Sequence, residues 1–227
     1  MIASLTRSPF ASLALTLLSA GALGAQEPSR PAESPQESSA RLARRGAGLT
    51  GATWSPTGLV TPTGATTSSS PFLEGYFRRG LDQHLALETS VAFWQRTLDV
   101  PTSGGLTGAP GGKTSLYLIP QFTAIRLYPF TRAGDALEPY LSGGVGLTLG
   151  IQNDAGSGGA LGGGGGTAML AGIGLSGSAG VEWRFSSAFG LTAGAHYTYV
   201  QFFEDLAGNR LYRGLGVRAG LTYRFQY

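Results

Sequence analysis

One histidine lies in a sequence context that could support catalysis. His196 is followed two positions later by Thr198, and Glu182 lies in the preceding segment. A histidine, a hydroxyl and a carboxylate are the groups that many hydrolases use to activate a nucleophile. The other histidine, His84, has no neighbours at a spacing typical of metal ligands. We therefore expect no metal and no cofactor. Whether His196, Thr198 and Glu182 form a catalytic set depends on how the segments that carry them fold.

Two glycine-rich segments match nucleotide-binding motifs only in part. Gly111 to Thr114 reads Gly-Gly-Lys-Thr, the end of a phosphate loop, but the glycine required five residues before Gly112 is Thr107. The glycine tract at 156–166 lacks the strand-to-helix context of a dinucleotide site. We predict that the first segment is an external loop that leads into a strand and that the second is a mobile loop, both without a nucleotide.

The C-terminal stretch, Tyr212 to Tyr227, alternates between apolar and small or polar residues. Successive side chains of a strand point to opposite faces, so this pattern predicts a strand with one apolar face. The stretch is longer than most strands of soluble proteins and suits a tilted crossing of a bilayer. Three aromatic residues end the apolar face, as is typical where lipid meets headgroups. The apolar positions are Leu215, Val217, Ala219, Leu221, Tyr223, Phe225 and Tyr227.

Seven further stretches with strand-like alternation precede this one. We predict short connections after the second, fourth and sixth strands and long ones after the first, third, fifth and seventh. That rhythm is typical of outer-membrane barrels with both termini in the periplasm. Pro120 lies inside the fourth stretch and predicts a bulge or local irregularity. The eight stretches are about Ala47–Val60, Phe72–Arg79, His84–Leu98, Thr114–Phe130, Pro139–Ile151, Ala168–Phe185, Phe189–Phe202 and Tyr212–Tyr227.

The N-terminal residues are expected to lie outside the fold. Residues 1–25 have one positive charge, an apolar core and a run of small residues, which predicts a secretory signal peptide cleaved near Ala25. Residues 26–46 are rich in Pro, Ser and Glu, which predicts a disordered lead-in that ends in the solvated residues Arg41, Arg44 and Arg45. The remaining domain, residues 47–227, is expected to form the barrel.

The composition excludes several classes of protein. Cysteine is absent, so a disulfide framework and thiolate metal sites are excluded. The formal charge is +3, but lysine occurs only at Lys113 and the arginines are scattered, so we expect no nucleic acid partner. Glycine is frequent, with 37 residues and no collagen-like period, which is consistent with close packing in a narrow interior.

Several motifs resemble the OmpA-type transmembrane barrels, the small eight-stranded outer-membrane proteins. The resemblance implies an all-β, eight-stranded antiparallel up-and-down barrel, monomeric, in the outer membrane of a diderm (Gram-negative) bacterium. It also implies contact with outer-membrane lipid and lipopolysaccharide, and recognition by the barrel-assembly machinery through Leu221, Tyr223, Phe225 and Tyr227. The matching stretches are Ile119-Pro120, Arg126 to Phe130, Glu138 to Gly146, Gly180 to Phe185 and Tyr223 to Tyr227.

The predicted inward faces of the strands carry charged side chains of both signs. An eight-stranded barrel is just wide enough to be filled by side chains, so we expect these charges to pair across the interior and close it. We expect at least two of the glutamates to bond arginines of neighbouring strands, Glu182 foremost. The inward charges are Glu74, Glu88, Glu182, Arg78, Arg96, Arg184, Arg218 and Arg224.

Three functions are compatible with these sequence features. The first is a non-enzymatic structural or surface-interaction protein with a plugged polar interior. The second is a narrow channel or a binding barrel for a small, apolar molecule. The third is a lipid A-modifying hydrolase, because His196 resembles part of the His-x-Ser pair of the outer-membrane lipid A deacylase. Here Thr198 replaces the serine and Tyr199 an asparagine, and His196 is expected to face the interior rather than lipid, so the third function is disfavoured.

Overall fold

The computed structural model describes residues 44–56, 70–100, 112–130, 135–155, 167–207 and 209–225. The predicted signal peptide and nearly all of the lead-in lie outside these ranges. Among the described residues, no helix is long and apolar enough to cross a membrane. The strands are β1 (Gly46–Trp54), β2 (Ser70–Gly80), β3 (Leu85–Val100), β4 (Gly112–Leu127), β5 (Leu137–Ala155), β6 (Thr167–Arg184), β7 (Phe189–Leu206) and β8 (Asn209–Arg224).

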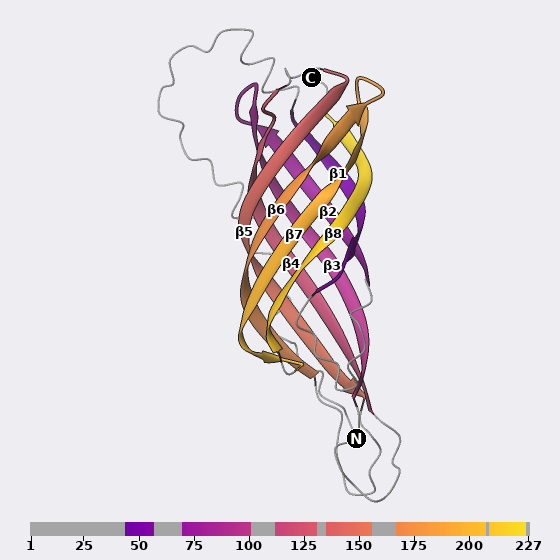
Figure 1. The fold of residues 1–227 in the computed structure, drawn as a ribbon, viewed down its shortest axis with the longest axis vertical. Coiled ribbons are helices and arrows are strands. Elements are labelled where there is room, and N and C mark those ends of the chain that lie inside the picture. The colour runs from indigo at the N-terminus through magenta and orange to yellow at the C-terminus, as the bar shows by residue number, and fades with distance from the viewer. Residues whose placement is uncertain are drawn as a thin grey trace, which may run out of the picture. The chain divides into compact units, whose positions relative to one another are not determined.

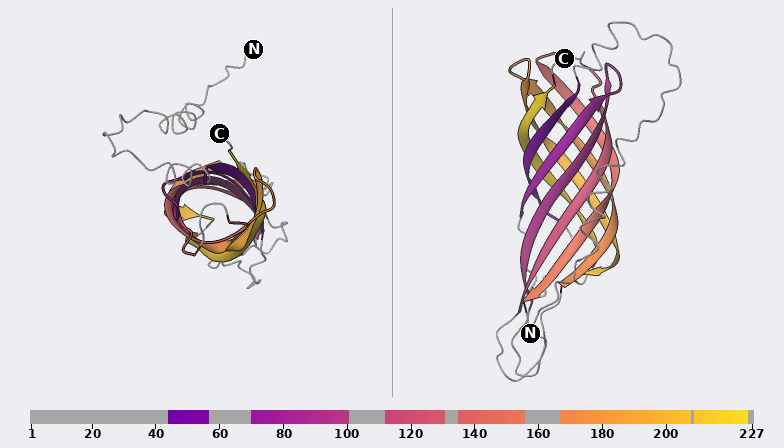
Figure 2. Two further views of the ribbon diagram at one scale, coloured as in Figure 1. Left: turned by 90° about the horizontal axis from the view of Figure 1, so that it is seen from above. Right: turned by 180° about the vertical axis from the view of Figure 1, so that it is seen from behind.

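The eight strands form one closed antiparallel barrel (Figure 1). Each strand pairs with the next one in the sequence, and β1 pairs with β8 to close the ring, which Figure 2 shows from above. The connections β2–β3, β4–β5 and β6–β7 lie at one end, called here the turn end, together with the start of β1 and the end of β8. The opposite end is called the loop end. The predicted fold class and up-and-down topology are confirmed.

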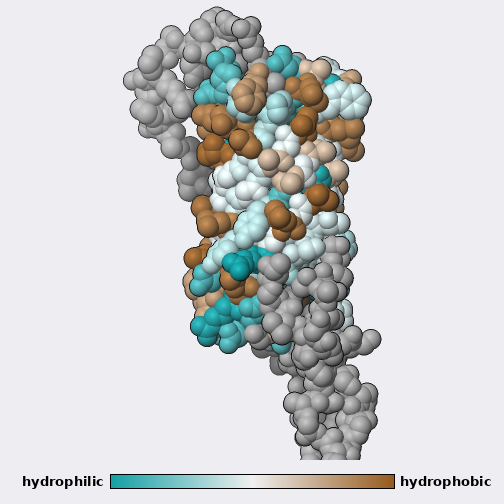
Figure 3. Space-filling view, viewed as in Figure 1, coloured by the Kyte–Doolittle hydropathy of each residue, from teal (hydrophilic) through white to brown (hydrophobic). Residues whose placement is uncertain are grey.

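The alternation of the sequence is realised as an apolar outer surface and a separate inner surface. On β8, Leu221 is 54% exposed on the outside, whereas Thr222 is 1% exposed inside the barrel. The same contrast holds on β2 between Phe77 outside and Arg78 inside. Figure 3 shows apolar residues over much of the outer surface, with hydrophilic residues mainly near the two ends. Such a surface suits contact with lipid.

Aromatic side chains gather on the outside of the turn end. The rings of Phe189 and Tyr223 lie 5.3 Å apart, and those of Tyr223 and Phe225 lie 5.6 Å apart. Trp183 extends this group on β6 and is 51% exposed. Aromatic side chains of this kind prefer the boundary between hydrocarbon and headgroups. Tyr227, the last position of the predicted assembly signal, lies outside the described residues.

The predicted strand bounds differ most from the structure in β1, β5 and β7. β5 ends at Ala155 rather than near Ile151. β1 ends at Trp54 rather than near Val60. The predicted long connection after the seventh strand is absent, because β7 continues to Leu206 and β8 begins at Asn209. A shift in register between Gln201 and Leu206 interrupts the two-residue period, which hid the end of β7 from the sequence pattern.

At Pro120 the structure has the predicted local irregularity rather than a bulge. β4 keeps a continuous register with β5, where Pro120 pairs with Thr148. On the β3 side, pairing is interrupted between Val91–Gln121 and Trp94–Leu118, and it resumes in the same register. The proline therefore interrupts the ladder without a bulge, because it removes one donor and inserts no extra residue.

The outward position of Leu221 predicts how arginine is tolerated on the outer surface. Leu221→Arg should lower the free energy of unfolding from a bilayer by more than about 1 kcal/mol, because it places a charge in hydrocarbon, but by less than the roughly 2–4 kcal/mol of a midplane arginine, because Tyr223 marks the nearby boundary. Phe203→Arg is the matched control, since Phe203 is also exposed but lies near the loop end beside the charged Glu204 and Asp205. It should cost about 0–1 kcal/mol. Urea titration in lipid vesicles measures the free energy of unfolding of both variants. Equal effects of the two substitutions would contradict the placement of Leu221 in contact with lipid hydrocarbon.

Candidate functional site

Four charged side chains form a closed ring inside the turn end of the barrel. They are Arg78, Glu88, Arg126 and Glu182, contributed by β2, β3, β4 and β6. Glu88 lies 3.3 Å from the Arg78 guanidinium and 2.7 Å from that of Arg126. Glu182 lies 2.6 Å from Arg78 and 3.7 Å from Arg126. Each carboxylate therefore contacts both arginines, and none of the four is more than 4% exposed.

A second group of charges extends this ring toward the turn end. Arg224 links the two groups, because its Nη2 lies 2.7 Å from Glu182 Oε1 and 2.7 Å from Glu138 Oε2. Glu138 is fully buried and also lies 3.3 Å from Arg184 and 3.5 Å from Arg44. We call the ring together with this group the charged cluster.

Two tyrosines fill the spaces beside the charged cluster. Arg44 lies 3.6 Å above the centre of the Tyr128 ring, and Arg126 lies 4.0 Å from the centre of the Tyr140 ring. These cation–π contacts stabilise guanidinium groups away from water. A Cβ atom at Gly180 would lie 2.6 Å from the Tyr140 hydroxyl, so the glycine there provides the room that the ring needs. Burial also raises the pKa of Tyr128, which lies beyond the end of β4, so its hydroxyl stays protonated.

A smaller polar layer lies at mid-height. Arg218 on β8 donates to Glu74 Oε2 at 3.1 Å and to Ser178 Oγ at 2.9 Å. A third bond from Arg218, 3.3 Å long, reaches the Tyr140 hydroxyl and connects this layer to the charged cluster. His196 on β7 is buried at the same height, where its ring stacks on Phe72 at a centroid distance of 5.6 Å.

The loop half of the interior is apolar. Trp54 and Trp94 meet edge to face with ring centres 5.4 Å apart, and the Trp54 indole N–H donates to the Gly214 carbonyl at 3.2 Å. We call this set the apolar cluster. Its buried members are Ala52, Trp54, Phe72, Ala92, Trp94, Leu116, Leu118, Phe122, Val200, Phe202, Leu206 and Tyr212.

The structure brings most of the predicted interior charges together. Of the three predicted glutamates, Glu88 alone pairs with arginines of neighbouring strands, Arg78 on β2 and Arg126 on β4. Glu182 was expected to bond arginines of neighbouring strands, whereas its partners come from β2, β4 and β8 across the lumen. Arg184 contacts Glu138 rather than Glu182. Arg96 is half-buried on the inward side of β3, opposite Leu116 and away from the charged cluster. Long side chains span the narrow lumen, so adjacency in the sheet decides only part of the pairing.

Sequence reasoning missed three members of the charged cluster. Arg126 follows apolar inward residues on β4, and Glu138 precedes the predicted start of the fifth strand. Extending the two-residue period from Tyr140 to Glu138 would have found the latter. Arg44 is buried and donates to the Gln83 carbonyl at 3.0 Å, so its placement in a solvated lead-in is wrong. Burial lowers the pKa of Arg44, while Glu138 opposes this effect.

The catalytic set considered from the sequence is not assembled. His196 pairs in the sheet with Ser178 and Gly216, whereas Glu182 pairs with Thr192 farther toward the turn end. The two oxygens of Glu182 are held by Arg78 and Arg224. Within the described ranges, no group of three or more His, Cys, Asp or Glu side chains could hold a metal ion.

Comparison with known proteins supports the architecture. No family model and no curated protein matches the sequence. The crystal structure of the outer membrane protein OprG from Pseudomonas aeruginosa is similar, with a TM-score of 0.54 and 18% identity over 81% of this chain and 98% of that one. Neisserial surface protein A (NspA) gives a TM-score of 0.53 and 15% identity over 80% and 97%. The fold is that of a small eight-stranded outer-membrane β-barrel.

The charged cluster predicts a large cost for losing one carboxylate. Glu182→Gln should lower the free energy of unfolding by about 3–5 kcal/mol, because Arg78, Arg126 and Arg224 lose a shared counter-charge in a buried site. Asp205→Asn is the control, since the Asp205–Arg210 pair is 61% exposed on both sides and is worth under about 1 kcal/mol. Thermal unfolding in detergent measures both, and similar effects for the two variants would contradict the argument.

Proposed function

We propose that this chain is a monomeric outer-membrane β-barrel with a closed interior, which acts as a structural or surface-interaction protein rather than as an enzyme. The proposal rests on the filling of the lumen by two sets of side chains, the charged cluster toward the turn end and the apolar cluster toward the loop end. Seven members of the charged cluster come from β2, β3, β4, β5, β6 and β8, and members of the apolar cluster come from β1 through β4, β7 and β8. An eight-stranded barrel leaves little room beyond such side chains.

The outer-membrane location rests on three independent features. The N-terminal sequence has the pattern of a secretory signal peptide. The outer face of the barrel is apolar and ends in aromatic side chains at the turn end. The closed ladder leaves no unpaired sheet edge, as a bilayer requires. With the connections of the turn end in the periplasm, β8 ends on the periplasmic side, as the assembly machinery would require.

The apolar cluster favours one alternative, a binding barrel for a small apolar molecule. Two of the three tryptophans, Trp54 and Trp94, belong to this cluster, whereas Trp183 faces outward. In a Trp183→Phe variant, saturable quenching of tryptophan fluorescence by 1-bromooctane would favour this alternative. Quenching that rises without saturation would favour the closed interior.

The location is tested by fractionation and gel mobility. We expect the protein in outer membranes, and we expect the unboiled protein to migrate faster than the boiled one, because a closed barrel resists detergent. Recovery in the soluble periplasmic fraction without a heat-dependent shift would contradict a membrane barrel.

The closed interior is tested by conductance. Purified protein in planar bilayers should give little steady current, because the charged and apolar clusters interrupt a water path. Glu182→Ala should give more frequent openings, since it removes a carboxylate that binds Arg78 and Arg224. A large, stable, ion-selective current from the unmodified protein would reject the closed interior in favour of the channel function.

A further inference from the structure

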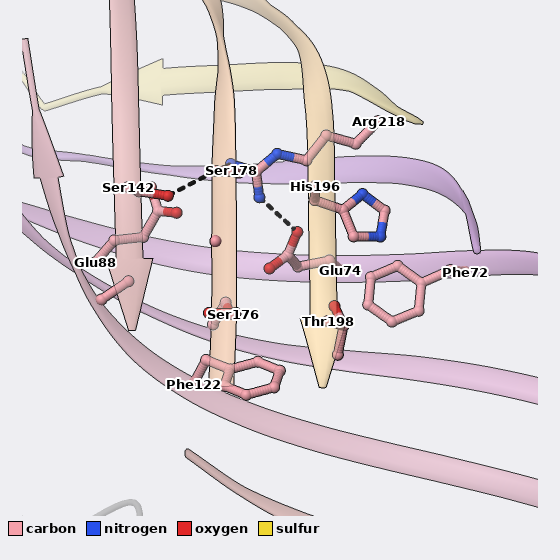
Figure 4. Close-up of a pocket in the computed structure, with 13 residues that line it drawn as sticks. Phe72, Glu74, Glu88, Phe122, Ser142, Ser176, Ser178, His196, Thr198 and Arg218 are labelled. Carbon is pink, nitrogen blue, oxygen red and sulfur yellow. Dashed lines mark hydrogen bonds and ion pairs between the residues drawn. The ribbon is translucent and has the colours of Figure 1, made fainter. Parts of the chain in front are cut away.

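A small cavity lies at mid-height inside the barrel, between the charged and apolar clusters. Its volume is ≈ 30 Å³. One water molecule needs roughly 10–15 Å³ of such a cavity, so there is room for about two water molecules. Figure 4 shows polar side chains from several strands directed toward it. The polar residues that line the cavity include Glu74, Glu88, Ser90, Ser176, His196 and Thr198.

His196 lines this cavity, and its ring nitrogens have no hydrogen-bond partners among the described side chains and backbone groups. It is 7% exposed, and both nitrogens, Nδ1 and Nε2, are buried. A neutral imidazole offers one donor and one acceptor, and leaving a buried polar group unsatisfied costs roughly 1–3 kcal/mol. The two ring nitrogens therefore call for a ligand that can both donate and accept.

The imidazole cannot easily turn away to find other partners. One side of the ring stacks on Phe72. A Cβ atom at Gly216 would collide with the ring carbon Cε1, so the ring is held close to the backbone of β8. The glycine at position 216 thus lets the imidazole occupy this place, where it lines the cavity.

The charges around the cavity favour a neutral ligand. Glu74 is already paired with Arg218 at 3.1 Å. Glu88 is paired with Arg78 and Arg126. An added cation or anion would find its counter-charge already engaged, whereas water can bridge a carboxylate, a hydroxyl and an imidazole without a charge of its own.

We propose that this cavity binds ordered water, and that one water molecule bridges the imidazole of His196 to the carboxylate of Glu74. The bridge completes the hydrogen bonds of His196 and connects β7 to the Glu74–Arg218 pair between β2 and β8. The charged cluster separates the cavity from the turn end and the apolar cluster separates it from the loop end. The bound water therefore exchanges slowly with the solvent. This inference concerns the interior alone and holds whatever the barrel binds at its surface.

Nuclear magnetic resonance on histidine-labelled protein in lipid nanodiscs tests the proposal. The chain has only two histidines, so a His84→Gln variant assigns the signals of His196. We expect cross-relaxation between water and the His196 ring protons. Its sign should be that of a water molecule that stays bound for longer than about a nanosecond. We also expect ring ¹⁵N shifts of a hydrogen-bonded imidazole. A ring without water contacts and with ¹⁵N shifts of an unbonded imidazole would overturn the proposal.

Two variants separate bound water from other sources of the signal. Ser176→Val fills the cavity with methyl groups and should abolish the water contact of His196, whereas persistence of the contact would overturn the proposal. His196→Phe retains the stacking on Phe72 but removes both ring nitrogens. If the cavity were dry, this change would raise the thermal stability by removing unsatisfied groups. With bound water, we expect an unchanged or lower melting temperature.

Discussion

The structure depends on burying charges in a narrow lumen without leaving any of them alone. An isolated ion costs several kcal/mol to remove from water, and only excellent geometry with an opposite charge offsets this cost. The ring of Arg78, Glu88, Arg126 and Glu182 meets the condition, because each member contacts two of opposite sign. Its members come from four strands. A slip of one residue on any of these strands would turn its charge outward, so the ring favours a single register.

The interior has two kinds of filling, and this division explains which parts of the fold the sequence revealed. In β6 and β8, small and charged inward residues contrast with large apolar outward ones, and the alternation is clear. In the loop half of β4, Leu116 and Leu118 face the apolar cluster while Ile119 faces the other way. Both faces of this part of the strand are then apolar, and the alternation between apolar and polar residues is lost. The existence of the strands was predictable there, but their facing was less so.

The charged cluster was predictable in part for a similar reason. Facing follows from alternation, so Glu74, Glu88 and Glu182 could be assigned to the inside from the sequence. Pairing depends on distances across the lumen, which a linear pattern does not contain. Glu138 lies one step of the two-residue period before Tyr140, at the start of β5, where the alternation was not followed far enough. Arg44 precedes β1, so no alternation marked it. The end of β7 was hidden by the irregular register near Gln201.

The high glycine content gives large inward side chains room in the narrow lumen. A lumen this narrow accepts Tyr140 because Gly180 and Gly194 face its hydroxyl, and it accepts the imidazole of His196 beside Gly216. These two large inward groups are thus matched by glycines on nearby strands. Substituting Gly180 would force the Tyr140 ring out of place and break the hydrogen bond that its hydroxyl accepts from Arg218. A filled interior of this kind leaves the outer face and the two ends of the barrel as the surfaces for interaction, which is the physical basis of the proposed function.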